Sequence, residues 1–165
     1  MSTSNLAPGS ERAGLFEFLD YKREALIASL QGLSDDQARM TPTASSLSLL
    51  SLVKHSAIWE RRRFQVIVAG RSFPSEWPDV RSEEENSTFR LADQDTVESV
   101  IADYREQIAT SNEILATIDL EAPCAWPEMA EQNVRWVAMH MIEETAQHAG
   151  HADIIRETID GRRWP

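Results

Sequence analysis

The chain has 165 residues, 42% of them hydrophobic and 26% charged, which suits one globular domain over residues 1–165 with a core of its own. Its formal net charge of −11 argues against a nucleic-acid partner, because binding a phosphate backbone needs a basic face. No apolar stretch approaches the length of a membrane span, and the N-terminal segment lacks the pattern of a signal peptide, so we expect a cytoplasmic protein without a membrane partner.

Two helices are expected in the first half of the chain. The first covers about residues 10–32, where apolar residues recur at helical spacing and Gly32 suits the C-terminal end. The second covers about residues 47–69 and ends before Gly70. It also carries the basic run Arg61 to Arg63, which we interpret as a solvated helix face in preference to an anion-binding site.

A long connection is expected over residues 71–91. It holds two prolines, a short helix near its acidic centre and the aromatic residues Phe73, Trp77 and Phe89. A connection of this length in a bundle crosses between its ends or covers a site. We favour a solvated crossover anchored by its aromatic residues, and a cover over a site is the alternative.

Two more helices are expected in the second half, over about residues 96–118 and 132–159, the last ending at Gly161. Between them Cys124, the only cysteine, lies in a proline-rich loop without a nearby histidine, so we expect a buried or inert thiol. No segment shows the pattern of a strand. The predicted fold is therefore all-α, a four-helix bundle with a long crossover between its second and third helices.

The last expected helix places ionisable side chains on its apolar face. At about 100° per residue, four of them fall within about 80° of one another: His140, Glu144, His148 and His151. Burying an unpaired carboxylate or a charged imidazole costs several kcal/mol, so these groups need partners such as one another, water or a metal ion. Hydrogen-bonded core histidines and a metal site both meet this need.

His55, the remaining histidine, lies with Trp59 on the inward face of the second expected helix. Two inward clusters on helices that can face each other suggest one site for a divalent transition metal, because imidazoles are common ligands and i, i+4 pairs can share an ion. Three protein ligands leave a position open, as catalytic metal sites do. Spacing alone leaves two pairs possible on the last helix, Glu144 with His148 or His148 with His151.

A family resemblance rests on two stretches, GLSDDQARMTPTASSLSLLSLVKHSAIWERRRF at residues 32–64 and HMIEETAQHAGHADIIRETIDG at residues 140–161. Both are similar to the DinB/YfiT-like superfamily of four-helix metal-binding proteins, particularly an actinobacterial branch of unassigned function. The resemblance covers most of the chain. It implies the same bundle, and because dimers are common in the family we expect a homodimer.

The resemblance also implies a ligand set. Members typically hold a divalent ion with one histidine of the second helix and two ligands of the last, which align with His55, Glu144 and His148. Many members have histidine in place of Glu144, but a His, Glu, His set occurs in relatives of mycothiol-dependent maleylpyruvate isomerase. His151 is then an alternative ligand or a neighbour of the ligands, and His140 orients the Glu144 carboxylate. Zinc is the favoured metal, with nickel, iron and manganese as alternatives.

The function implied by the resemblance is thiol chemistry. Characterised relatives are S-transferases and isomerases that use mycothiol or bacillithiol, and a metal cation can lower the pKa of such a thiol to give a thiolate at neutral pH. Arginine outnumbers lysine 14 to 2, a bias of GC-rich genomes that favours mycothiol. We therefore expect a metal-dependent S-transferase or related detoxification enzyme that joins a low-molecular-weight thiol to an electrophile.

Two other functions remain open at the level of sequence. The first is a non-catalytic metal-binding module, for instance in a stress response, whose ion a fourth protein ligand such as His151 would close off. The second is a helical scaffold whose histidines are hydrogen-bonded core residues. Metal analysis of the purified protein separates the scaffold from the other two.

Overall fold

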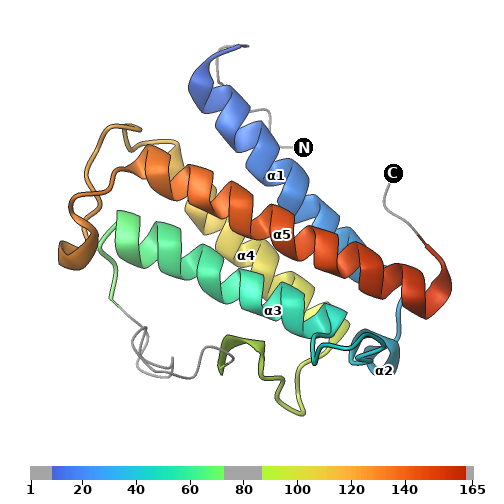
Figure 1. Cartoon of the computed structure of the whole chain (residues 1–165). Helices are drawn as coiled ribbons and strands as arrows, with labels where there is room; N and C mark the ends of the chain where they lie inside the picture. The colour runs from blue at the N-terminus through green and yellow to red at the C-terminus, as the bar shows by residue number, and fades with distance from the viewer. Residues whose placement is uncertain (1–8, 73–86, 163–165) are drawn as a thin grey trace.

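A computed structural model shows an all-α bundle (Figure 1), and the structure describes residues 9–72 and 87–162. Two short 3-10 turns, η2 (Ser87–Phe89) and η3 (Pro127–Met129), lie in the connections. The helices are α1 (Glu11–Leu30), α2 (Asp35–Ala38), α3 (Leu49–Glu60) with its π-helical continuation η1 (Arg61–Val68), α4 (Val97–Leu115) and α5 (Val134–Asp160). No strand occurs in the described part, which holds one isolated bridge between Pro123 and Asn133.

Polar residues cap the start of each long helix. The side chains of Ser10, Ser48, Thr96 and Asn133 each accept a hydrogen bond from a backbone N–H in the first turn. Each cap satisfies a donor that has no partner within the helix, which fixes where the helix begins. At the other end of α5, Gly161 adopts a left-handed conformation with a φ of 76°.

The four long helices pack in two pairs. Helix α1 packs against α5 in the same chain direction: Arg135 pairs with Glu11 near both starts, and Arg156 donates to the carbonyl oxygen of Ser29 near both ends. Helix α3 packs against α4, and it also contacts α5. Figure 1 shows α3 and α5 side by side with opposite chain directions. Going along α3 in chain order, successive turns therefore lie opposite turns of α5 that come earlier and earlier in the chain.

A buried ion pair crosses the core between α1 and α3. The guanidinium of Arg23, 1% exposed, donates to both carboxylate oxygens of Glu60, which is fully buried; the Nε–Oε2 distance is 3.1 Å. Arg23 also donates to Asn112 of α4 at 2.9 Å and to Asp20 at 2.7 Å. Multiple partners compensate the desolvation of the two charges, and they join three helices at one level of the bundle.

The sequence-based helices are confirmed, with differences at their ends and in their geometry. The third expected helix ends at Leu115 rather than residue 118. The second expected helix begins at Leu49 rather than residue 47, and from Arg61 it continues as a π-helix, in which the Ala69 N–H bonds to the Phe64 carbonyl oxygen. The small elements α2 and η3 were not expected. The short helix predicted at the acidic centre of the connection, with Phe73 and Trp77, lies outside the described residues. Within the described ranges, no helix has the length and apolar character that crossing a bilayer requires.

Candidate metal centre

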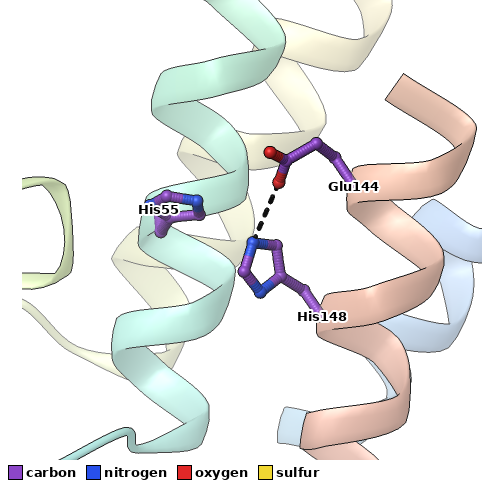
Figure 2. Close-up of side chains that lie close together, drawn as sticks. All are labelled: His55, Glu144 and His148. Atoms are coloured by element: carbon purple, nitrogen blue, oxygen red, sulfur yellow. Dashed lines mark hydrogen bonds and ion pairs between the residues drawn. The ribbon is translucent and has the colours of Figure 1, made fainter. Parts of the chain in front are cut away.

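Three side chains from two helices converge between α3 and α5. His55 lies on α3, whereas Glu144 and His148 lie one turn apart on α5 and point toward α3 (Figure 2). Each offers one ligand atom, and these atoms all lie within 4.8 Å of one another. Of the two pairs that spacing left open on the last helix, the structure brings Glu144 with His148 to His55.

His55 is held by contacts outside its own helix. Its Nδ1 lies 2.7 Å from the hydroxyl oxygen of Thr88, and its ring stacks on Phe89 with centroids 3.9 Å apart and planes 7° from parallel. With the ring proton on Nδ1, donated to the Thr88 hydroxyl, Nε2 keeps the lone pair that a metal ligand needs. Both contacts come from η2, so the end of the long connection positions the α3 histidine.

Burial keeps His55 in its neutral form. The side chain is 7% exposed, and burial together with the neighbouring His148 lowers the pKa of His55 to about 3, although Glu144 opposes this shift. A neutral imidazole is the form that binds metals. At pH 7 this histidine is therefore ready to act as a ligand without first losing a proton.

Glu144 and His148 interact directly. His148 Nε2 lies 3.1 Å from Glu144 Oε2, and this hydrogen bond is the largest cause of a lowered pKa of the Glu144 carboxyl, against the opposing effect of burial. Glu144 is therefore an anion at neutral pH. Its side chain and that of His148 both extend from α5 toward α3, where His55 lies (Figure 2). Such an arrangement suits either a shared proton or a shared cation.

The other two histidines of α5 lie beside this group. His151 is not one of the three converging residues; the centre of its ring lies 6.0 Å from that of His148. His140 stacks on Trp136 at 5.2 Å, and among the described residues no hydrogen bond joins it to Glu144. The predicted role of His140 in orienting that carboxylate thus has no hydrogen bond to support it.

The basic run at the end of α3 is not a solvated face, and that interpretation was wrong. Arg62 is 4% exposed, and the guanidinium carbons of Arg62 and Arg63 each lie 4.8 Å from the centre of the Trp59 ring. Arg62 and Arg63 follow Trp59 by three and four residues, so helical spacing puts all three on one face. A count of charges along the sequence missed this, whereas their helical angles would have revealed it.

Sequence reasoning also missed Thr88 and understated Phe89. Thr88 lies in a connection without periodicity, and no neighbouring residue marks it as the partner of His55. Phe89 was expected as a loop anchor, and its stacking on His55 shows that this end of the connection covers one side of the group. The expectation for Cys124 is confirmed: the thiol is buried, and burial raises its pKa.

Comparison with known proteins places the chain in a family. A family model described as mycothiol-S-transferase matches residues 14–161, which is most of the chain. The chain belongs to the mycothiol-S-transferase family. The fold is similar to that of a solved structure whose title reads "Crystal structure of the conserved protein of locus from Enterococcus faecalis". The two align with a TM-score of 0.71 and 15% sequence identity, over 93% of this chain and 99% of that one. That likeness shows the fold alone, and no curated protein matches the chain.

The donor set of this mycothiol-S-transferase family member fits a divalent transition metal. Two imidazoles and one carboxylate are typical ligands of catalytic zinc, and three protein ligands leave room in a tetrahedral shell for a further group. The surroundings also suit an ion, because contacts hold the donors before an ion arrives: Glu144 and His148 hydrogen-bond to each other. His55 likewise has its second nitrogen satisfied by Thr88.

Proposed function

We propose that the protein is a divalent-metal-dependent S-transferase that joins mycothiol to an electrophilic small molecule. The single observation that carries this proposal is the convergence of His55, Glu144 and His148 in a chain whose family is described as mycothiol-S-transferase. Zinc is the favoured metal because the three donors leave one tetrahedral position for a thiol sulfur.

His55, Glu144 and His148 would hold the ion, and a cation bound there supplies the charge that lowers the pKa of a thiol to near neutrality. The chain's own residues contribute orientation. Thr88 hydrogen-bonds with Nδ1 of His55 and so holds the ring with Nε2 free for the ion, and the stacked Phe89 ring restricts its rotation. The reaction then forms a carbon–sulfur bond while a leaving group departs with its electron pair, and the thiol proton passes to solvent.

The neighbourhood of the donors supports a reactive site over a closed structural one. A non-catalytic metal-binding module was the alternative, with His151 as the fourth ligand that closes the shell. The converging group has three members, and the His151 ring lies at 6.0 Å from that of His148. A homodimer stays a prediction from the family resemblance, and a cytoplasmic location stays a prediction from the sequence.

The test is a conjugation assay with zinc-loaded protein, mycothiol and monochlorobimane. Substituting a ligand, as in His55→Gln or His148→Gln, should lower the rate by at least about 100-fold, whereas His151→Gln should retain it within about threefold. Stoichiometric zinc without conjugation across mycothiol, bacillithiol and glutathione would overturn the proposal and favour the non-catalytic module.

A further inference from the structure

A second polar cluster lies beside the three donors, toward one end of the bundle. Trp59 of α3 follows His55 by four residues, and Arg63, in the π-helical continuation η1, follows Trp59 by four; on α5, His140 precedes Glu144 by four. Figure 1 shows that α3 and α5 run in opposite directions. Residues after His55 in the chain and residues before Glu144 therefore lie toward the same end of the bundle, which puts Arg63 and His140 on the same side of the three donors. The charge of Arg63 accordingly acts on both Glu144 and His140: burial lowers the pKa of the His140 imidazole most, and Arg63 adds to this effect.

The cluster contains nitrogen atoms without hydrogen-bond partners. Trp59 Nε1, Arg63 Nε and His140 Nε2 are all shielded from solvent, and none has a partner within residues 9–72 and 87–162. Among the described residues, the hydrogen bond that Arg63 makes is a weak one, from its Nη1 to the Met129 sulfur at 3.6 Å. Buried donors in native proteins are nearly always satisfied. Trp59 Nε1 and Arg63 Nε both carry a proton, and the Arg63 guanidinium carbon lies 4.8 Å from the centre of the Trp59 ring, so these neighbouring donors indicate a missing acceptor.

The charge of the cluster also lacks a direct partner. Among the described residues, no carboxylate lies within ion-pair distance of Arg63, although burial opposes its charge. A divalent ion with two neutral imidazoles and one carboxylate has a net charge of about +1, which a thiolate neutralises. The Arg63 cation takes no part in that balance, and an anionic ligand group would compensate its charge.

We propose that Arg63, with Trp59 and His140, forms an anion subsite that binds a carboxylate group of the electrophilic substrate. A guanidinium presents paired N–H donors that match a carboxylate, and the indole and imidazole nitrogens supply further donors around it. The identity of the bound group as part of the electrophile rests on the proposed function. The existence of the subsite does not, since it depends on the chain's own donors.

The test is isothermal titration with benzoate and benzamide, which share a shape and differ in charge. Protein as purified and protein loaded with zinc are both titrated, for the wild type, Arg63→Gln and Arg63→Lys. The matched control is Arg105→Gln, which removes an exposed arginine from α4. We expect benzoate to bind at least about tenfold more tightly than benzamide, and Arg63→Gln to abolish that preference.

The outcomes separate the possible causes. Arg105→Gln should leave the preference intact, and Arg63→Lys should retain part of it, because lysine keeps the charge and loses the paired donors. Equal binding of the two probes by the wild type, or a benzoate preference that persists in Arg63→Gln, would overturn the subsite. Because no thiol is present, failure of S-transfer and failure of the subsite are distinguishable.

Discussion

His55 depends on Thr88 for its orientation, and this contact can be tested alone. Thr88→Val keeps the shape of the side chain and removes the acceptor of the Nδ1 proton. We expect zinc affinity to fall by about tenfold or more, as for other residues that orient a ligand. Competition with a chromophoric chelator measures the affinity.

Thr158→Val is the control for that substitution. The Thr158 hydroxyl donates a hydrogen bond to the Ile154 carbonyl oxygen within α5, away from the three metal-ligand candidates. Equal zinc affinities for wild type, Thr88→Val and Thr158→Val would show that Thr88 does not position His55.

The buried imidazole of His55 also predicts how stability depends on pH. Its pKa is about 3 in the folded protein and 6.5 in the unfolded chain, so between these values the unfolded state binds a proton that the folded state does not. The free energy of unfolding of the metal-free protein should therefore fall by about 2 kcal/mol as the pH falls from 7 to 5. Urea unfolding at each pH, compared with His55→Gln, isolates the effect; identical pH slopes for the two proteins would contradict it.

At the residue scale, helical angles in the sequence predicted His55, Glu144 and His148 as inward-facing groups. These angles did not decide between Glu144 and His151, because both side chains fall on the same face of α5. Which of them reaches His55 depends on the point at which α3 packs against α5. The contact with Thr88 could not be predicted, since it joins an irregular connection to a helix 33 residues away along the chain.

At the scale of elements, the buried pair Arg23 and Glu60 ties α1 to α3 at the point where α3 becomes a π-helix. Glu60→Ala leaves the Arg23 cation buried, and we expect a loss of about 3 kcal/mol in the free energy of unfolding, because Asp20 and Asn112 retain part of the interaction. Urea denaturation followed by circular dichroism measures it.

The exposed pair of Arg135 and Glu11 provides the comparison for that loss. Glu11→Ala should shift the urea midpoint far less, because water and salt screen an exposed pair. Similar midpoints for Glu60→Ala and Glu11→Ala would show that burial of the Arg23 pair is not what stabilises the junction.

Helix ends followed from the sequence because capping chemistry is local: Thr96 and Gly161 mark the start of α4 and the end of α5, as expected. The π-helix could not be predicted from the sequence. Its backbone hydrogen bonds span five residues instead of the four of an α-helix, and the apolar spacing of the segment is compatible with both. The error over the basic run has a different source. Arg62 and Arg63 follow Trp59 by three and four residues, which is predictable from helical spacing, and both guanidinium groups lie over the Trp59 ring instead of facing solvent.

For the whole molecule, the proposed ion would link two helices that are far apart in the chain. Since His55 lies on α3 and Glu144 and His148 on α5, zinc should bind the folded state and not the unfolded one. We expect free zinc at about 1,000 times its dissociation constant to stabilise the protein by about 4 kcal/mol. Differential scanning calorimetry with and without a chelator tests this, and an unchanged melting temperature would contradict it.

The all-α bundle was predictable because the long helices have clear apolar periodicity and polar caps. Their arrangement was not, because the contacts that decide it join distant residues, as when Arg156 of α5 donates to the Ser29 carbonyl oxygen of α1. Family membership agrees with the resemblance carried by residues 32–64 and 140–161, both of which lie wholly within the matched residues 14–161.

The central claim, that the three donors hold an ion to which a thiol binds, is tested most directly by X-ray absorption at the zinc edge. Zinc-loaded Cys124→Ser protein, which has no thiol of its own, should show only nitrogen and oxygen neighbours. Adding mycothiol should introduce one sulfur neighbour at about 2.3 Å. A spectrum without sulfur at saturating mycothiol, or a sulfur neighbour that persists in His148→Gln at unchanged zinc content, would contradict the account.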